Sequence, residues 1–221
     1  MTRPLSAIPL AALFLLGACS SNSDTTGGLN PPPASQQFLI LGSDMSGYSQ
    51  NVVVSLNDAV AAGVTVTVNG DTLTTTSGSG FYSGHLTTAV AEGGAVQVRV
   101  TNGTLTAVGN GLVPAAPVIT DVQHGALGAP VTINWTAATS SDSVNVYLDY
   151  RLSDSSTASI NKTVAGSART VTLATSGIPA NSVVTAAGVD AVMNGTFTGD
   201  VAAASNMRLR AVGGSFPVTI P

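Results

Sequence analysis

The sequence is poor in charged side chains, and this scarcity excludes one class of function. Only 8% of the 221 residues are charged, with seven Lys or Arg against eleven Asp or Glu. The basic residues form no cluster, so the chain lacks the electrostatic basis for nucleic-acid binding. The hydrophobic fraction of 44% is too high for a disordered chain. We therefore expect a folded protein whose surface consists mainly of Ser, Thr, Asn and Gly.

Side chains that carry chemistry are also scarce. The chain has two histidines, His85 and His124, and a single glutamate, Glu92. No His-x-x-x-His, Cys-x-x-Cys or Gly-x-Ser-x-Gly spacing occurs, so both histidines are expected to be exposed loop residues. We predict no catalytic residue and no enzymatic activity. A hydrolase whose Ser-His-Asp site is assembled from loops stays open as an alternative, because such a site leaves no local motif.

Aspartate accounts for ten of the eleven acidic residues. Asp142, Asp149 and Asp154 flank one predicted strand and are weak candidates for a calcium site. However, the chain has no Asp-x-Asp-x-Asp loop closed by a glutamate, and aspartate is common in turns without any metal. The sequence therefore predicts no metal site.

The chain contains one cysteine, Cys19, which follows a nine-residue apolar run, residues 8–16. This run is too short to span a bilayer, which requires about 20 apolar residues. The motif Leu16-Gly17-Ala18-Cys19 resembles the lipobox of bacterial lipoproteins. The resemblance implies a signal peptide over residues 1–18 and a covalent lipid on Cys19, which anchors the chain to a membrane. No other cofactor is predicted, and the folded part has no disulfide.

Residue Ser20 bears on the location implied by this resemblance. In sorting systems that retain lipoproteins with aspartate after the lipidated cysteine, serine implies the outer membrane of the cell envelope. Residues 19–37 then form a flexible tether, because they are rich in Ser, Asn, Thr and Gly and end near Pro31-Pro32-Pro33.

From Phe38 onward the apolar residues recur with a period of two. Two hairpins with two-residue loops are predicted, at Asn69-Gly70 and Asn102-Gly103. The first loop places Val68 opposite Asp71 and Val66 opposite Leu73, and the second places Val100 opposite Leu105 and Val98 opposite Ala107. With further strands, about seven are expected before residue 113, which predicts a β-sandwich over residues 38–113.

The segment Leu112-Val-Pro-Ala-Ala-Pro117 predicts a joint to a second domain over residues 114–221. Beyond it, the strand VTINWTA (131–137) and the tyrosine-bearing strand VNVYLDYR (144–151) resemble a fibronectin type III domain. Residues 178–183 lack the corner tyrosine of that family, so a general immunoglobulin-like sandwich is the alternative. A last hairpin is predicted at Asn194-Gly195. The predicted fold class is thus all-β, with two tandem immunoglobulin-like antiparallel β-sandwiches, the second similar to fibronectin type III.

Alternation along the tyrosine-bearing strand predicts an outward strip of side chains. If Val146, Leu148 and Tyr150 point inward, the opposite face carries one aromatic ring among polar groups: Asn145, Tyr147, Asp149 and Arg151. Such a strip suits the binding of sugars or peptides. The alternative is an ordinary solvated sheet face with cross-strand pairs.

These observations predict a non-catalytic, membrane-anchored envelope lipoprotein. Its β-sandwich domains are expected to act as adhesive, spacer or complex-accessory modules, with an envelope protein complex as partner. The alternative function is binding of a carbohydrate or cell-wall polymer through the outward strip.

Overall fold

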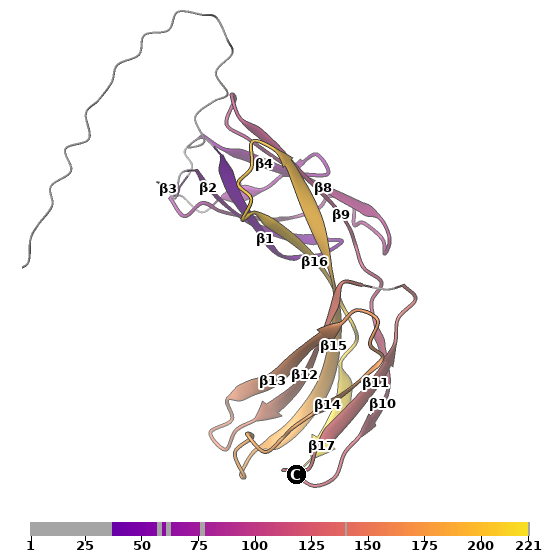
Figure 1. Cartoon of the computed structure of the whole chain (residues 1–221). Coiled ribbons are helices and arrows are strands. Elements are labelled where there is room, and N and C mark those ends of the chain that lie inside the picture. Colours follow the sequence, from indigo (N-terminus) through magenta and orange to yellow (C-terminus); the bar gives the residue numbers. More distant parts are fainter. Residues whose placement is uncertain (1–36, 57–58, 61–62, 76–77, 140, 221) are drawn as a thin grey trace, which may run out of the picture. The chain divides into compact units, whose positions relative to one another are not determined.

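The computed structural model describes residues 37–56, 59–60, 63–75, 78–139 and 141–220 (Figure 1). The lipobox with Cys19 and the predicted tether up to residue 36 lie outside the described residues. All regular structure in the described part is β-strand. That part contains no helix with the length and apolarity needed to cross a membrane. The described part of the chain is therefore all-β, as predicted.

The first β-sandwich begins with nine strands from the N-terminal half of the described chain. Their bounds are β1 (Phe38–Met45), β2 (Ser49–Leu56), β3 (Ala59–Val60), β4 (Thr65–Val68), β5 (Asp71–Thr72), β6 (Thr74–Thr75), β7 (Phe81–His85), β8 (Ala95–Thr101) and β9 (Thr106–Leu112). In one continuous sheet order, β5, β4, β8 and β9 lie on one side of β15 and β16, and β1, β2, β7 and β6 lie on the other. These two groups of strands form two layers, because both contribute side chains to one shared core. Between the layers lies a hydrophobic cluster that includes Phe38, Ile40, Val66 and Val98.

The second β-sandwich has three strands facing four, in a fibronectin type III-like arrangement. The bounds of the remaining strands are β10 (Val118–Gln123), β11 (Val131–Thr136), β12 (Ser143–Arg151), β13 (Thr157–Ala165), β14 (Thr170–Leu173), β15 (Val183–Gly199), β16 (Asn206–Val212) and β17 (Phe216–Ile220). One sheet has the order β10-β11-β14, and the other pairs β13 with β12, β12 with β15, and β15 with β17. Val131, Ile133 and Trp135 alternate along β11 and are buried together in its core.

The predicted hairpin at Asn69-Gly70 is confirmed. Val68 pairs with Asp71, and the two loop residues have φ angles of 49° and 92°, as a type I′ turn requires. The predicted register at Asn102-Gly103 is wrong by two residues, because Thr101 pairs with Thr106 across a longer loop. The Asn102 side chain explains the longer loop, since its Oδ1 accepts hydrogen bonds from the backbone nitrogens of Thr104 and Leu105 at 3.3 and 3.0 Å. A shift of two residues leaves the same side chains facing the core.

The predicted hairpin at Asn194-Gly195 is wrong, because β15 runs straight through both residues. The backbone nitrogen of Asn194 donates to Asp142 Oδ2 at 2.6 Å, and Gly195 pairs with Met207 on β16. At Gly195 an added Cβ would lie 2.7 Å from the Met207 sulfur, so the glycine allows this close approach within the strand.

Strands β15 and β16 return the chain to the first sandwich. In the sheet order they lie between β9 and β1, and β16 pairs with β1 in parallel. Met207 and Leu209 are fully buried in the first hydrophobic cluster, and Phe197 packs against it. The structure thus places Met207 and Leu209 in the first core, whereas the boundary expected from sequence assigned them to the domain over residues 114–221.

A fragment of residues 37–113 is expected to lack a stable fold. It loses β16 from the middle of its sheet, and with it the buried side chains Met207 and Leu209. Each removal of such a side chain costs roughly 2–5 kcal/mol, which is comparable to a typical stability of about 5–15 kcal/mol. Circular dichroism and urea unfolding should show a cooperative transition for residues 37–221 but none for residues 37–113. Cooperative unfolding of the short fragment would contradict this assignment of β16.

Candidate functional site

An open polar groove lies on the outward face of β12, β13, β15 and β16. Its volume is about 560 Å³, and its lining residues are Asn145, Tyr147, Asp149, Ser159, Asn161, Thr163, Asp190, Arg208 and Arg210. Strand alternation creates this face, because Val144, Val146 and Leu148 are buried on the opposite side of β12. On β16 the same alternation sends Met207 and Leu209 into the first core and turns the two arginines toward the groove.

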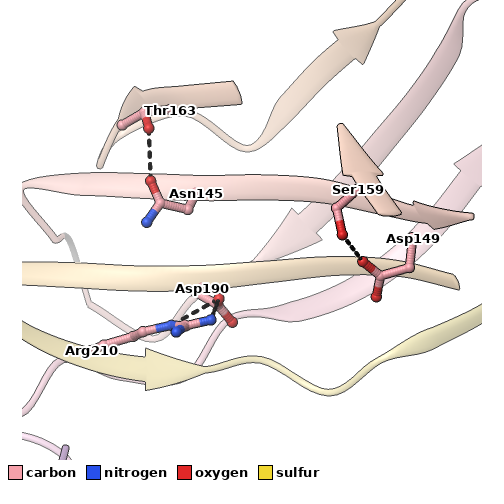
Figure 2. A network of polar contacts seen from close by, with 6 residues as sticks. All are labelled: Asn145, Asp149, Ser159, Thr163, Asp190 and Arg210. Carbon is pink, nitrogen blue, oxygen red and sulfur yellow. Dashed lines mark hydrogen bonds and ion pairs between the residues drawn. The ribbon is translucent and has the colours of Figure 1, made fainter. Parts of the chain in front are cut away.

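Cross-strand hydrogen bonds between β12 and β13 fix two side chains of the groove (Figure 2). Thr163 Oγ1 donates to Asn145 Oδ1 at 2.7 Å, and Ser159 Oγ donates to Asp149 Oδ1 at 2.5 Å. Both pairs join residues directly opposite each other in the register of the two strands. These bonds orient the amide of Asn145 and the carboxylate of Asp149 along the β13 side of the groove.

The ring of Tyr147 lies against the backbone of β15 at Gly188, its partner in the strand register. An added Cβ at Gly188 would lie 2.0 Å from Tyr147 Cζ and 2.3 Å from both Cε2 and Oη. Only glycine therefore permits this position of the ring. Because Tyr147 is half-buried and lines the groove, one side of its ring is supported by backbone while the side chain remains accessible to a ligand.

A buried ion pair connects Asp190 on β15 to Arg210 on β16 (Figure 2). Asp190 has 1% of its side chain exposed, and Arg210 has 36% exposed. Arg210 Nε donates to Asp190 Oδ2 at 2.9 Å, and Nη2 donates to the same oxygen. A buried carboxylate requires such a partner, because an uncompensated buried charge is strongly destabilising.

Burial raises the pKa of Tyr147 above its ordinary value of 10.0, and the negative charges of Asp190 and Asp149 raise it further. Arg210 acts in the opposite direction, since its positive charge favours the tyrosinate. Tyr147 is therefore a neutral phenol throughout the physiological range, with a hydroxyl that can donate a hydrogen bond.

Two polar side chains of the groove remain unengaged by the described part of the chain. Arg208 and Asn161 are both exposed and line the groove. Within residues 37–220 as described, neither side chain makes a hydrogen bond, and Arg208 makes no ion pair. The groove therefore offers a guanidinium and an amide to an incoming ligand.

The sequence-predicted strip falls partly within this groove. Asn145, Tyr147 and Asp149 line it, whereas Arg151 is exposed at the end of β12 and does not. The β13 contribution was missed, although the alternating polar residues Ser159, Asn161 and Thr163 carry the signal for it. The contributions of β15 and β16 have no local signal in the sequence, because Arg210 reaches Asp190 only through the pairing of β16 with the continuous strand β15.

The three calcium candidates do not share a site. Asp142 accepts from the Asn194 backbone, Asp149 from Ser159, and Asp154 from the backbone and hydroxyl of Ser156 at 2.9 and 2.6 Å. In the described ranges, no group of three His, Cys, Asp or Glu side chains is placed to hold a metal ion.

Neither histidine lines the groove. His85 ends β7 and stacks on Tyr48, with ring centroids 4.6 Å apart and planes 13° apart. His124 is exposed after β10, with its Nδ1 3.2 Å from the carbonyl oxygen of Gly125.

Comparison with known proteins finds only a distant likeness. No protein-family model matches the chain, and no curated protein sequence matches it. Among solved structures, the crystal structure of chicken CNTN1 FN1-FN3 domains is similar over 81% of this chain, with 16% sequence identity and a TM-score of 0.38. The chain spans 62% of that structure's length. This likeness concerns the fold alone.

Replacing Arg210 by Ala is expected to destabilise the protein by about 3 kcal/mol, because it leaves the Asp190 carboxylate buried without its partner. The matched control is Arg208→Ala on the same strand, which removes an exposed side chain that makes no hydrogen bond or ion pair in the described part of the chain and should change stability by less than about 0.5 kcal/mol. Urea unfolding monitored by circular dichroism measures both. Equal stability of the two variants would contradict the role assigned to the ion pair.

The raised pKa of Tyr147 predicts a specific pH dependence. Because the folded state favours the neutral phenol, its contribution to stability is complete below pH 10.0 and is lost as the pH rises through the folded pKa. Asp190→Asn should lower the pKa of Tyr147, and Asp149→Asn should lower it less. Tyr82 is the internal control, since burial alone raises its pKa. Titration followed by NMR of the tyrosine rings tests this, and an unchanged Tyr147 curve in both variants would refute it.

Proposed function

We propose that this chain is a non-catalytic, membrane-anchored envelope lipoprotein whose two β-sandwiches form an adhesive module. In this proposal, the groove on the β12 face is the contact surface for a carbohydrate or cell-wall polymer. The lipid on Cys19 holds the module at the membrane, and residues 19–37 allow it to reach its target.

One observation carries the proposal: the Tyr147 ring is supported on Gly188 inside an open groove of hydrogen-bonding side chains. A sugar ring has an apolar face and a rim of hydroxyl groups, so it matches an aromatic ring surrounded by amides, hydroxyls and charged groups. The neutral phenol of Tyr147 adds a donor at the same place. An open groove also suits a polymer, which must enter and leave from the side.

The arrangement of charged groups supports a binding role over a catalytic one. The Asp190 carboxylate is buried and engaged by Arg210, and the Asp149 carboxylate accepts from Ser159. Neither His85 nor His124 lines the groove. A carboxylate pair free to act as acid and base, as glycoside hydrolysis requires, is thus not among the described lining residues.

A retention assay with the full chain in mild detergent tests the proposal. Wild-type protein should be retained on insoluble cell-wall polysaccharide or peptidoglycan, and Tyr147→Ala should weaken retention at least tenfold, which corresponds to about 1.4 kcal/mol. Gly188→Ala should weaken it as well, because the new Cβ displaces the ring. Tyr48→Ala is the matched control, since this exposed tyrosine lies outside the groove.

Each outcome of this assay decides between functions. Equal retention of wild type and Tyr147→Ala would remove the groove from the mechanism. Absence of retention for every form would favour a spacer or complex-accessory role over polymer binding. Release of soluble sugar from the retained polymer would instead indicate a hydrolase.

A further inference from the structure

Three acceptor groups of the groove are engaged within the protein, whereas two side chains that can donate, those of Arg208 and Asn161, make no hydrogen bond in the described part of the chain. Asp190 is engaged by Arg210, and the carboxylate of Asp149 receives the hydroxyl of Ser159. The Oδ1 atom of Asn145 receives the hydroxyl of Thr163. A ligand therefore meets oxygens that are already partly satisfied.

The free donors lie on both sides of Tyr147. Arg208 on β16 presents a whole guanidinium group, and Asn161 on β13 presents an amide directly opposite Tyr147 in the strand register. A guanidinium has five N–H donors in a planar fork that matches a carboxylate in two parallel hydrogen bonds. A guanidinium has no acceptor atom, so Arg208 selects a ligand group that brings acceptor oxygens.

We propose that the groove recognises an acidic glycan, with a sugar ring stacked on Tyr147 and a carboxylate of the same chain paired with Arg208. This inference rests on the proposed function, because it names the class of polymer that the same groove binds. The two side chains line one groove but come from different strands, so they contact different parts of the ligand.

The strand register gives the groove enough length for several sugar units. Asp149 pairs with Ala186 of β15, and Arg208 pairs with Asn194. These two partners are eight residues apart along one strand, which corresponds to about 27 Å at 3.4 Å per residue. A single sugar cannot cover this length, so the ligand is an oligomer or polymer.

The two ends of the groove differ in charge. Asp149 places a carboxylate at one end, and Arg208 places a guanidinium at the other. Like charges repel and opposite charges attract, so an acidic sugar is disfavoured beside Asp149 and favoured beside Arg208. The groove thereby fixes the position of the ligand's carboxylate relative to the ring on Tyr147.

Isothermal titration calorimetry on the full chain in detergent tests this inference with oligogalacturonate, oligomannuronate and the methyl esters of both. The ester keeps the sugar rings and removes the charge. Wild-type protein should bind at least one acid form tenfold or more tightly than its ester, with an affinity that falls as salt is raised. Arg208→Gln should abolish this preference by weakening the acid form alone, and Arg208→Lys should restore part of it. Tyr147→Ala should weaken both forms.

Arg151→Gln is the matched control, because Arg151 is an exposed arginine at the end of β12 outside the groove. The affinity of the Arg151→Gln variant for the acid forms should equal that of wild type. This result would separate pairing with Arg208 from a general electrostatic attraction between the acidic ligand and the protein. Unfolding midpoints of the two Arg→Gln variants should match wild type, because neither side chain makes a hydrogen bond or ion pair in the described part of the chain.

The outcomes separate this inference from the proposed function. The inference is overturned if wild-type protein binds acid and ester with equal affinity, or if the Arg208→Gln variant still prefers the acid. Binding of the ester that depends on Tyr147 would leave the proposed function intact. Failure of both acid forms to bind also overturns it. If acid forms bind through Arg208 but Tyr147→Ala changes nothing, both the stacking of sugar on the ring and the proposed function fail.

Discussion

The structure depends on one strand that serves two hydrophobic cores. Strand β15 is 17 residues long, and its first half contributes Val184, Ala187 and Val189 to the second core. Its second half pairs with β9 of the first sandwich, and Phe197 packs against the first core. Because β15 does not turn back at residue 194, β16 also joins the first sandwich and presents its other face to the groove. The groove is thus a consequence of this shared strand.

The segment of β15 beneath the groove is locally unfavourable for a strand. Gly188 has no side chain to pack, and Asp190 buries a carboxylate on a sheet face. The surrounding side chains offset both defects, since Tyr147 covers the glycine and Arg210 pairs with the aspartate. A sequence that placed valine at both positions would form a more regular sheet but would leave no groove. Such conflicts between local preference and global fold are typical of functional sites.

Features fixed by neighbouring residues could be predicted from the sequence, and features fixed by distant pairing could not. The period of two identified the buried side of β12 and therefore Asn145, Tyr147 and Asp149. The Asn-Gly rule succeeded at residue 69, where both loop residues have positive φ. The same dipeptide misled at residue 194, where Asp142 and Met207, remote in sequence, hold it in an extended strand. Arg208 and Arg210 were missed for the same reason, because only strand pairing brings them to Tyr147.

The scarcity of charged side chains favours recognition of an acidic ligand at the groove. A net charge of −4 spread over the sequence is weak, and at physiological salt charges more than about 8 Å apart are largely screened from one another. An acidic ligand therefore experiences mainly the groups that it contacts. At Arg208 the contacted group is a cation, and the buried aspartate of the groove, Asp190, is paired with Arg210. In a strongly charged protein the same exposed arginine would have many counter-ions within reach. A surface built from Ser, Thr, Asn and Gly leaves it available, so that one guanidinium suffices to discriminate between an acidic sugar and a neutral one.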